Sequence, residues 1–492
     1  MAQISIQDLT FCYDGGSENV FDGVSINIDT DWKLGLVGRN GRGKTTLLKL
    51  LEGEYEYSGK ISANVKFVYF PFAVDGAERA AVEVVSDICP SAEEWMIMRE
   101  ADLLELDADA LYRPFCELSN GERTKLLLAG LFLTEGGFFL IDEPTNHLDL
   151  AAREAVAAYL KRKSGFIIVS HDRAFLDGCI DHVMSINRTN IEIQSGDFSS
   201  YLENFERDRA FEAARNERLK KDIARLTEAA RRTSDWSDKT EASKYGKASS
   251  GLKQDKGYVG HKAAKLMKRA KSAELRRERA VEEKSKLLHN VERNEDLKMF
   301  PLSHRSERIV AVDGASLFYG GREVLSGVKL EVKRGERVAL DGRNGCGKSS
   351  LLKLIAGADI EHTGAVAVAS GAVVSFVPQS TEGLGGGLTE FARDRKLDES
   401  LFKTVLRKMG FERSEFDNDL SELSQGQRKK VCLAASLCTS AHLYIGDEPL
   451  NYIDIYSRLQ IERLLCEFCP TMIFVEHDKA FRERVATRVV RL

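Results

Sequence analysis

The sequence lacks long apolar runs. Its hydrophobic stretches, such as residues 138–141 and 165–169, are strand-sized and far below the roughly 20 apolar residues of a membrane-spanning helix. The first residues, MAQISIQDLTF, contain no basic segment followed by an apolar stretch, so we expect no secretory signal. These two absences argue against a membrane-embedded or secreted protein.

Paired cysteines are lacking as well. The nine cysteines are odd in number and scattered, which favours reduced thiols and a cytoplasmic location. Cys466 and Cys469 form one CxxC without a second pair or a nearby histidine, so packed thiols are favoured over a structural zinc site. The length of 492 residues, with 43% hydrophobic and 30% charged residues, suits two globular domains and a connector.

Charge is unevenly distributed along the chain. Residues 201–300 contain 26 lysines and arginines against 18 aspartates and glutamates, whereas the whole chain has a net charge of −5. Two acidic regions therefore flank a basic middle segment. A localised positive surface favours a polyanionic partner.

The chain repeats itself. Four short motifs recur in the same order at an offset of 304 to 306 residues, which predicts a duplicated domain. The motifs are GRNGRGKTT and GRNGCGKSS from Gly38 and Gly342, LSNGER and LSQGQR from Leu118 and Leu423, IDEPTNHLD and GDEPLNYID from Ile141 and Gly446, and SHD and EHD from Ser170 and Glu476.

Each copy has the pattern of an α/β domain. A strand at residues 33–38 or 337–342 leads into a glycine loop and then a helix, and apolar runs at 138–141 and 166–169 are typical of buried parallel strands. We therefore predict two tandem doubly wound domains, each with a helical insertion before the LSxG segment. The expected domains are residues 1–204 and 301–492, joined by a connector at 205–300.

The glycine loops have the phosphate-binding pattern GxxxxGK[ST]. Their backbone N–H groups can surround phosphates at a helix N-terminus, where the helix dipole favours anions. Lys44 and Lys348 would reach the β- and γ-phosphates, while Thr45 and Ser349 would ligate Mg²⁺. The other predicted ATP-binding residues of the loops are Gly38, Arg39, Asn40, Gly41, Arg42, Gly43 and Thr46 in the first copy and Gly342, Arg343, Asn344, Gly345, Cys346, Gly347 and Ser350 in the second.

An apolar strand ends in Asp-Glu in each copy. Asp142 and Asp447 would hold Mg²⁺, directly or through water, and Glu143 and Glu448 would act as general bases on the attacking water. The residues His171 and His477 follow the next strand, from which a side chain can reach the γ-phosphate, and we predict catalytic roles for both.

The LSNGE segment at 118–122 and LSQGQ at 423–427 resemble the signature of ABC ATPases, and this resemblance covers both repeats. It implies ATP and Mg²⁺ as cofactors, ATP hydrolysis, and a monomer whose two domains pair head to tail. Ser424 and Gly426 would then close over ATP at Lys44, and Ser119 and Gly121 over ATP at Lys348. Tyr13 and Tyr319 match the aromatic residue that stacks on adenine, although each could be a half-buried core tyrosine instead.

Two positions depart from the family pattern. The family has a glutamine that contacts Mg²⁺ and water after the strand following the first helix. Gln379 supplies it in the second copy, but Phe72 stands there in the first, so the first site is expected to hydrolyse ATP more slowly. In addition, Gly446 replaces the usual bulky apolar residue before Asp447, which is expected to loosen the end of that strand.

The connector has the pattern of a helical hairpin. Residues 203–235 and 263–296 are rich in alanine and charged residues without proline or glycine, and Leu219, Ile223, Leu226 and Ala230 follow a coiled-coil spacing. Two antiparallel helices of about 33 residues would form an arm of roughly 50 Å.

The predicted tip of the arm is basic and aromatic. Residues 231–280 hold 15 basic and 6 acidic residues. Aromatic side chains that stack on bases, interleaved with cations that bind phosphates, favour RNA contact over a merely solvated linker. The predicted RNA-contacting residues are Trp236, Lys244, Tyr245, Lys247, Lys253, Tyr258 and Lys262.

Fused ABC repeats joined by a long hairpin resemble the ABC-F proteins, which act on ribosomes and lack transport domains. The segments TDWKLGLVGRNGRGKTTLL, FVYFP, DKGYVGHKAAKLMKR and DEPLNYID resemble the Lsa/Vga group of antibiotic-resistance ABC-F proteins. That resemblance implies a hairpin that enters at the ribosomal E site and contacts 23S rRNA and P-site tRNA near the peptidyl-transferase centre. It also implies displacement of lincosamides, pleuromutilins and streptogramin A compounds.

Three alternatives remain open at this point. The chain could be an ABC-F translation factor that acts on stalled ribosomes without drug resistance. It could be the ATPase subunit of an ABC transporter, which would have no use for a basic hairpin. It could also be a DNA-handling ABC ATPase, although these usually carry zinc modules or much longer coiled coils.

Overall fold

The structure is a computed structural model that describes residues 3–13, 19–72, 74–146, 148–187, 190–208, 211, 221, 297–343 and 345–492. The described residues of both repeats belong to one compact unit, Met1–Tyr201 with Glu295–Leu492. The predicted hairpin lies almost wholly outside the described residues, so its helices stay a prediction. Among the helices that are described, none combines the length and hydrophobicity needed to cross a bilayer.

The first repeat is built on a six-stranded sheet in the order β5-β6-β7-β3-β8-β9, parallel except for β9. The strand β7 has the sequence FIIV and is buried along its whole length, as expected for a parallel strand covered on both faces. The strands are β3 (Lys33–Gly38), β5 (Lys66–Phe70), β6 (Gly137–Asp142), β7 (Phe166–Val169), β8 (His182–Ile186) and β9 (Ile191–Ser195).

A smaller antiparallel sheet, in the order β2-β1-β4, completes the α/β part of the first repeat. Its apolar side chains, such as Ile4 and Ile6, form one core with Leu47 and Leu48 of α1 and with Leu34 and Ile167 of the large sheet. The helix α1, which follows the glycine loop, therefore packs against both sheets. These elements are β1 (Gln3–Phe11), β2 (Phe21–Asp29), β4 (Ser58–Ser62), α1 (Lys44–Glu52), α5 (Leu150–Lys161) and α6 (Arg173–Cys179).

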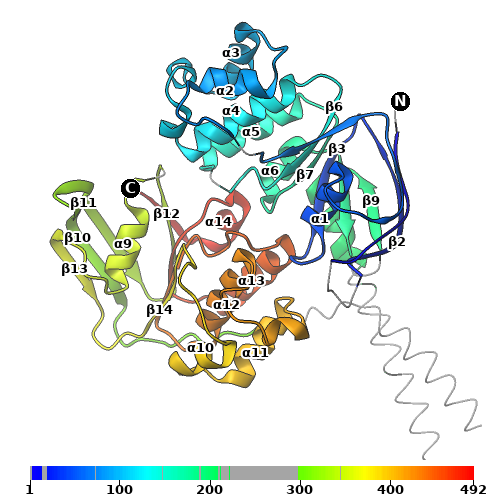
Figure 1. Cartoon of the computed structure of the whole chain (residues 1–492). Coiled ribbons are helices and arrows are strands. Elements are labelled where there is room, and N and C mark those ends of the chain that lie inside the picture. Colours follow the sequence, from blue (N-terminus) through cyan, green and yellow to red (C-terminus); the bar gives the residue numbers. More distant parts are fainter. Residues whose placement is uncertain are drawn as a thin grey trace, which may run out of the picture. The chain divides into compact units, whose positions relative to one another are not determined.

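The predicted helical insertion of the first repeat is present, and its helices α2, α3 and α4 gather in one group (Figure 1). Ser119 caps α4: its hydroxyl accepts from the Glu122 N–H, and the Glu122 carboxylate accepts from the Ser119 N–H at 2.8 Å. The LSNGE segment thus begins a helix because its serine and glutamate form a capping box. The elements are α2 (Ala81–Ile88), α3 (Glu94–Leu103), η1 (Ala108–Leu111), η2 (Phe115–Glu117) and α4 (Asn120–Leu133).

The second repeat has the same plan, with a fully parallel sheet in the order β14-β15-β16-β12-β17 and an antiparallel sheet β11-β10-β13. The sheet strands are β10 (Arg308–Tyr319), β11 (Arg322–Lys333), β12 (Arg337–Asp341), β13 (His362–Val368), β14 (Val374–Val377), β15 (Leu443–Asp447), β16 (Met472–Val475) and β17 (Arg488–Arg491). The helices are α9 (Lys348–Ile355), α10 (Leu388–Asp394), α11 (Glu399–Lys408), η4 (Arg413–Phe416), α12 (Gln425–Cys438), α13 (Ile455–Phe468) and α14 (Lys479–Val485).

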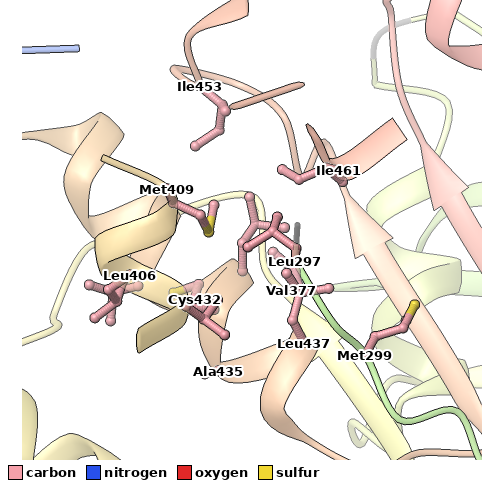
Figure 2. Packing of buried hydrophobic residues seen from close by; sticks show 14 of the residues in the cluster. Leu297, Met299, Val377, Leu406, Met409, Cys432, Ala435, Leu437, Ile453 and Ile461 are labelled. Carbon is pink, nitrogen blue, oxygen red and sulfur yellow. The ribbon is translucent and has the colours of Figure 1, made fainter. Parts of the chain in front are cut away.

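The last residues of the connector pack into the second repeat. Leu297 and Met299 are buried in one cluster with Val377 of β14 and Leu437 of α12, as Figure 2 shows. Leu302 N–H also donates to the Ala441 carbonyl at 2.8 Å. The second repeat therefore takes the end of the connector into its own core.

The expected loosening of β15 at Gly446 is wrong. The strand runs through Asp447, and its register with β16 continues to the pair Asp447 and Val475. The cause is local packing: a Cβ at Gly446 would lie 2.9 Å from the Pro449 Cγ atom, so the proline ring fills the space of the missing side chain.

All nine cysteines are free in the structure, and the Cys469 thiol donates to the Cys466 carbonyl at 3.1 Å. The prediction of two tandem α/β domains, each with a helical insertion, is confirmed. The exact boundaries at residues 204 and 301 stay a prediction.

Two candidate nucleotide sites

Each glycine loop has the backbone geometry that phosphate binding requires. Gly41 and Gly43 have φ values of 82° and 85°, and Gly345 and Gly347 have 80° and 93°, which only glycine adopts without strain. A Cβ at Gly43 would also lie 2.6 Å from a Val20 methyl carbon. The loops end at the N-termini of α1 and α9, where backbone N–H groups and the helix dipole attract anions.

The lysine of each loop is buried within it. Lys44 Nζ donates to the Gly38 carbonyl (2.9 Å), the Arg39 carbonyl (3.2 Å) and Asn40 Oδ1 (3.3 Å). Lys348 Nζ donates to the corresponding carbonyls of Gly342 (2.6 Å) and Arg343 (2.9 Å). Burial lowers the pKa of Lys44, and the carboxylates of Asp454 and Glu143 partly offset this effect. Each ammonium group is thus positioned in the loop that would surround the phosphates.

The residues expected to hold Mg²⁺ are in contact at both sites. Thr45 Oγ1 donates to Asp142 Oδ2 at 2.6 Å, and Ser349 Oγ donates to Asp447 Oδ1 at 2.9 Å. Asp447 Oδ2 is buried and has no hydrogen-bond partner in the described part of the chain. Carboxylate and hydroxyl oxygens are the ligands that Mg²⁺ prefers, so these pairs fit an ATP-bound magnesium ion. The ion would neutralise phosphate charge during transfer.

The two glutamates lie beside the two histidines. His171 Nε2 is 3.0 Å from Glu143 Oε1, and His477 Nε2 is 3.5 Å from Glu448 Oε1. Both glutamates have left-handed backbone conformations, with φ values of 51° and 44°, a strained geometry that is found at functional sites. The structure therefore brings each predicted base next to its predicted histidine partner.

Both carboxylates are held in the ionised form. Burial would raise the pKa of Glu448, but hydrogen bonds from His477 and Gln379 outweigh this and lower the pKa to about 2. Burial likewise opposes ionisation of Glu143, while His171 and Lys44 shift its pKa below the usual value. Ionised carboxylates can accept a proton from an attacking water at neutral pH.

The two sites differ at the position where the family has a glutamine, as the sequence implies. The Gln379 side chain lies near Glu448 and helps to lower its pKa, whereas Phe72 packs edge-on against Phe70 with ring centroids 6.0 Å apart. The first site instead has a polar contact that sequence reasoning missed, because the Tyr69 hydroxyl donates to Asp142 Oδ2 at 3.1 Å. Comparison of the repeats would have shown Tyr69 opposite Phe376.

The two candidate adenine-stacking tyrosines keep half of their surface accessible. Tyr13 is 46% exposed and Tyr319 is 49% exposed. The Tyr13 hydroxyl is hydrogen-bonded to Thr46 Oγ1 at 2.7 Å, which fixes the tyrosine ring beside α1, the helix that follows the first glycine loop. Stacking of adenine on these rings stays a prediction.

At the first site, the glycine loop meets the second repeat. Asn40 Nδ2 donates to the Tyr452 carbonyl at 2.7 Å, and Arg42 forms an ion pair with Glu412 at 3.3 Å. A Cβ on the buried Gly426 would lie 2.7 Å from Asn40 Nδ2. The structure therefore brings the first loop and the second LSxG segment together, in the head-to-tail arrangement expected for Lys44.

For the reciprocal pair, the counterpart of Asn40 is Asn344, which lies outside the described residues. Ser119 is exposed and bonded only within its own cap, and no hydrogen bond or ion pair among the described residues joins Ser119 or Gly121 to the second loop. Closure of this second composite site stays a prediction. Asn344, and the seven predicted RNA-contacting residues between Trp236 and Lys262, lie outside the described residues.

Buried ion pairs, which sequence reasoning also missed, link the loops around the sites. Arg153 pairs with Asp172 at 2.8 Å, and the equivalent Arg458 pairs with Asp478 at 3.4 Å. Across the repeats, Arg173 contacts the fully buried Glu462 at 2.5 Å. The recurrence of the two arginines at the repeat offset was the available sequence signal.

Lys429 is a further functional candidate, present in the second repeat alone. It is buried in α12, and its Nζ donates to the carbonyls of Pro378 (2.6 Å) and Gln379 (3.2 Å). Thr124, the equivalent residue of the first repeat, bonds only the Asn120 carbonyl of its own helix. Lys429 therefore ties the helix behind Ser424 and Gly426 to the glutamine loop of the second site.

Two glycine loops with their Asp-Glu pairs, histidines and serine-capped LSxG helices define an ATPase of the ABC class. Residues 21–146 and 325–451 both match the family model described as ABC transporter. This chain is similar to the ribosome protection protein VmlR of Bacillus subtilis (28% identity, covering 96% of this chain and 84% of that protein). It is also similar to the ATP-binding protein Uup of Caulobacter vibrioides (28%, 97% and 75%) and to ABC transporter F family member 2 of Arabidopsis thaliana (27%, 96% and 75%).

Among solved structures, the archaeal ribosome recycling factor aABCE1, in its complex with the ribosomal stalk protein aP1, has a TM-score of 0.65 at 21% identity, covering 98% of this chain and 87% of that chain. A structure of the RNase-L inhibitor has a TM-score of 0.58 at 21% identity, covering 93% and 82%. These two likenesses concern the fold. The chain belongs to the ABC transporter family of ATPases, and within it to the ABC-F group. It is an ATP-hydrolysing enzyme.

The two sites should contribute unequally to turnover. We expect Glu448→Gln to slow ATP hydrolysis at least about twofold more than Glu143→Gln, because only Glu448 is oriented by a glutamine. Steady-state phosphate release from the two single variants measures this difference. Equal rates, or the reverse order, would contradict the assignment of Gln379 as a catalytic aid.

Proposed function

We propose that this ATPase binds the ribosome and protects it from antibiotics that act at the peptidyl-transferase centre. The observation that carries the proposal is the similarity to VmlR, a ribosome protection protein, which extends over 96% of this chain. The similarity includes the connector between the two ATPase repeats as well as the repeats themselves.

The charge of the connector supports the same partner. Its excess of basic residues, with aromatic residues among them, suits contact with phosphates and unstacked bases of ribosomal RNA. In this proposal Trp236, Tyr245 and Tyr258 stack on bases, while Lys244, Lys247, Lys253 and Lys262 bind phosphates of 23S rRNA close to the P-site tRNA. In this proposal the protein works as a cytoplasmic monomer, in which one chain supplies both halves of each composite ATP site.

In this proposal, ATP binding and hydrolysis control how long the protein stays on the ribosome. Lys44 and Lys348 bind the phosphates, Glu143 and Glu448 take a proton from the attacking water, and Ser424 with Gly426 closes the first site from the opposite repeat. Closure would fix the two repeats together, and hydrolysis would separate them. The proposed consequence is that the ATP-bound form stays on the ribosome and hydrolysis releases it.

Shortening residues 236–261 to a tight turn tests the proposal. We expect the variant to fold and hydrolyse ATP at the basal rate, because all of the predicted ATP-site residues lie in the two repeats, and to lose all antibiotic protection. The measurement is growth of expressing cells in graded lincosamide, pleuromutilin and streptogramin A concentrations, beside ribosome pelleting. The triple change of Lys244, Lys247 and Lys253 to glutamine should keep the length of the tip but weaken pelleting, most strongly at low salt, and make the remaining binding less dependent on salt.

The runner-up function, an ABC-F factor for stalled ribosomes, predicts another outcome. Wild-type protein would then pellet with ribosomes and restore translation on stalled complexes, yet give no protection against any of the three drug classes. Full protection by the shortened protein would instead show that the tip is only a linker.

A further inference from the structure

Tyr69 occupies a distinctive position beside the first magnesium site. It lies on β5, one residue before Phe70, which is paired in register with Ile141 of β6. Its hydroxyl donates to Asp142 Oδ2 at 3.1 Å, and Thr45 Oγ1 donates to the same oxygen at 2.6 Å. Two donors on one oxygen fix the rotation of the Asp142 carboxylate.

The second site has no such contact. In that repeat Val377 pairs with Gly446 in the register that Phe70 and Ile141 have in the first, so Phe376 is the equivalent of Tyr69. A phenylalanine has no hydroxyl to donate. Consistent with this, Asp447 accepts from Ser349, and its other carboxylate oxygen has no partner among the described residues.

The two repeats therefore combine their residues differently. The copy with a tyrosine on the strand has Phe72 in the loop that follows, and the copy with a phenylalanine on the strand has Gln379 there. The glutamine lies near the catalytic Glu448, whereas the tyrosine donates a hydrogen bond to the metal-binding aspartate. Each site thus keeps one polar side chain from this strand and loop to orient an active-site carboxylate.

We propose that Tyr69 is a positioning residue of the first ATP site, holding the Asp142 carboxylate in the orientation that binds Mg²⁺. The first site thereby keeps metal affinity without the loop glutamine, even though its Glu143 lacks the contact that Glu448 has. The inference rests on the ATPase activity and the site geometry, and is independent of the proposed ribosomal role.

The test uses the full chain with Lys348→Ala, which disables nucleotide binding at the second loop. ATP-dependent Mn²⁺ binding is followed by electron paramagnetic resonance, and metal-free ATP binding is measured in EDTA. We expect Tyr69→Phe to weaken Mn²⁺ binding by about tenfold or more, the effect of losing one hydrogen bond to a charged group, without changing metal-free ATP affinity. Phe376→Tyr is the matched control and should leave Mn²⁺ binding unchanged.

A second variant separates positioning from packing. Tyr69→Phe with Phe72→Gln gives the first site the residues of the second, and should restore a substantial part of the Mn²⁺ affinity. Unchanged Mn²⁺ binding in Tyr69→Phe would overturn the proposal. An equal loss of metal-free ATP affinity, or a lowered melting temperature that accounts for the loss, would also overturn it, because both indicate a structural role. Failure of Phe72→Gln to restore binding would refute the equivalence of the two arrangements.

Discussion

Replacing both Glu143 and Glu448 with glutamine is expected to abolish ATP turnover and leave ATP binding intact. Each carboxylate is ionised, lies within 3.5 Å of a histidine and follows the strand that carries the metal-binding aspartate. Glutamine preserves the size and most contacts of the side chain but cannot take a proton from water. General-base catalysis contributes about 100-fold to 10,000-fold, so phosphate release should fall by at least about 100-fold.

The double variant needs a control that also changes two glutamates. Glu117 and Glu422 occupy equivalent, exposed positions just before the two LSxG segments, and their change to glutamine should leave turnover at the wild-type level. Nucleotide binding is measured by equilibrium dialysis, and ribosome association by pelleting with ATP, where the proposed function predicts that the inactive double variant is trapped. Turnover at the wild-type rate would remove both glutamates from the mechanism.

The sequence predicts the site residues that occur in both repeats. The loop lysines, Asp142 and Asp447, and the two glutamates each recur at one offset, and local chemistry determines their roles: a glycine loop needs positive φ values, and a buried strand ends in an acid. The structure places them as expected because parallel strands bring their carboxyl ends to the same edge of a sheet.

The residues that the sequence did not predict act through contacts between distant segments. Tyr69 reaches Asp142 because β5 and β6 are neighbours, and Arg173 reaches Glu462 across the two repeats. Neither contact leaves a periodic or spaced pattern in the sequence. The error at Gly446 has the same origin, since the Pro449 ring that supports the strand there is recognisable only after folding.

The difference between the composite sites was equally hidden. Gly426 is buried against Asn40, while Gly121 is only partly buried, although both glycines belong to nearly identical motifs. The motif alone predicts two equal pairings. Among the described residues, the first loop packs against Tyr452 and Glu412, which supports the first pairing, and the second pairing stays a prediction.

Gly426 lies so close to the first loop that even a methyl side chain at this position should have a large effect. A Cβ there would lie 2.6 Å from the Tyr452 carbonyl and 2.7 Å from Asn40 Nδ2, distances that real Cβ atoms do not adopt. Both neighbours are constrained, because Tyr452 has a left-handed φ of 63° and Asn40 also accepts from Lys44. The contact with Asn40 can relax if the two repeats move apart at this site, whereas the contact with Tyr452 lies within the second repeat and needs a local shift of its loop.

We expect Gly426→Ala to lower ATP turnover by about 5-fold to 150-fold, the equivalent of the 1–3 kcal/mol that overpacking of a close contact usually costs. ATP binding by the Lys44 loop should persist, because its phosphate-binding N–H groups and lysine do not depend on Gly426. Gln425→Ala, an exposed neighbour in the same helix turn, is the control and should keep full turnover. Phosphate release and fluorescent-nucleotide binding separate the two effects. If Gly426→Ala hydrolyses ATP at the wild-type rate, the close approach of Gly426 and Asn40 has no part in the catalytic cycle, and the head-to-tail assignment of the first site fails with it.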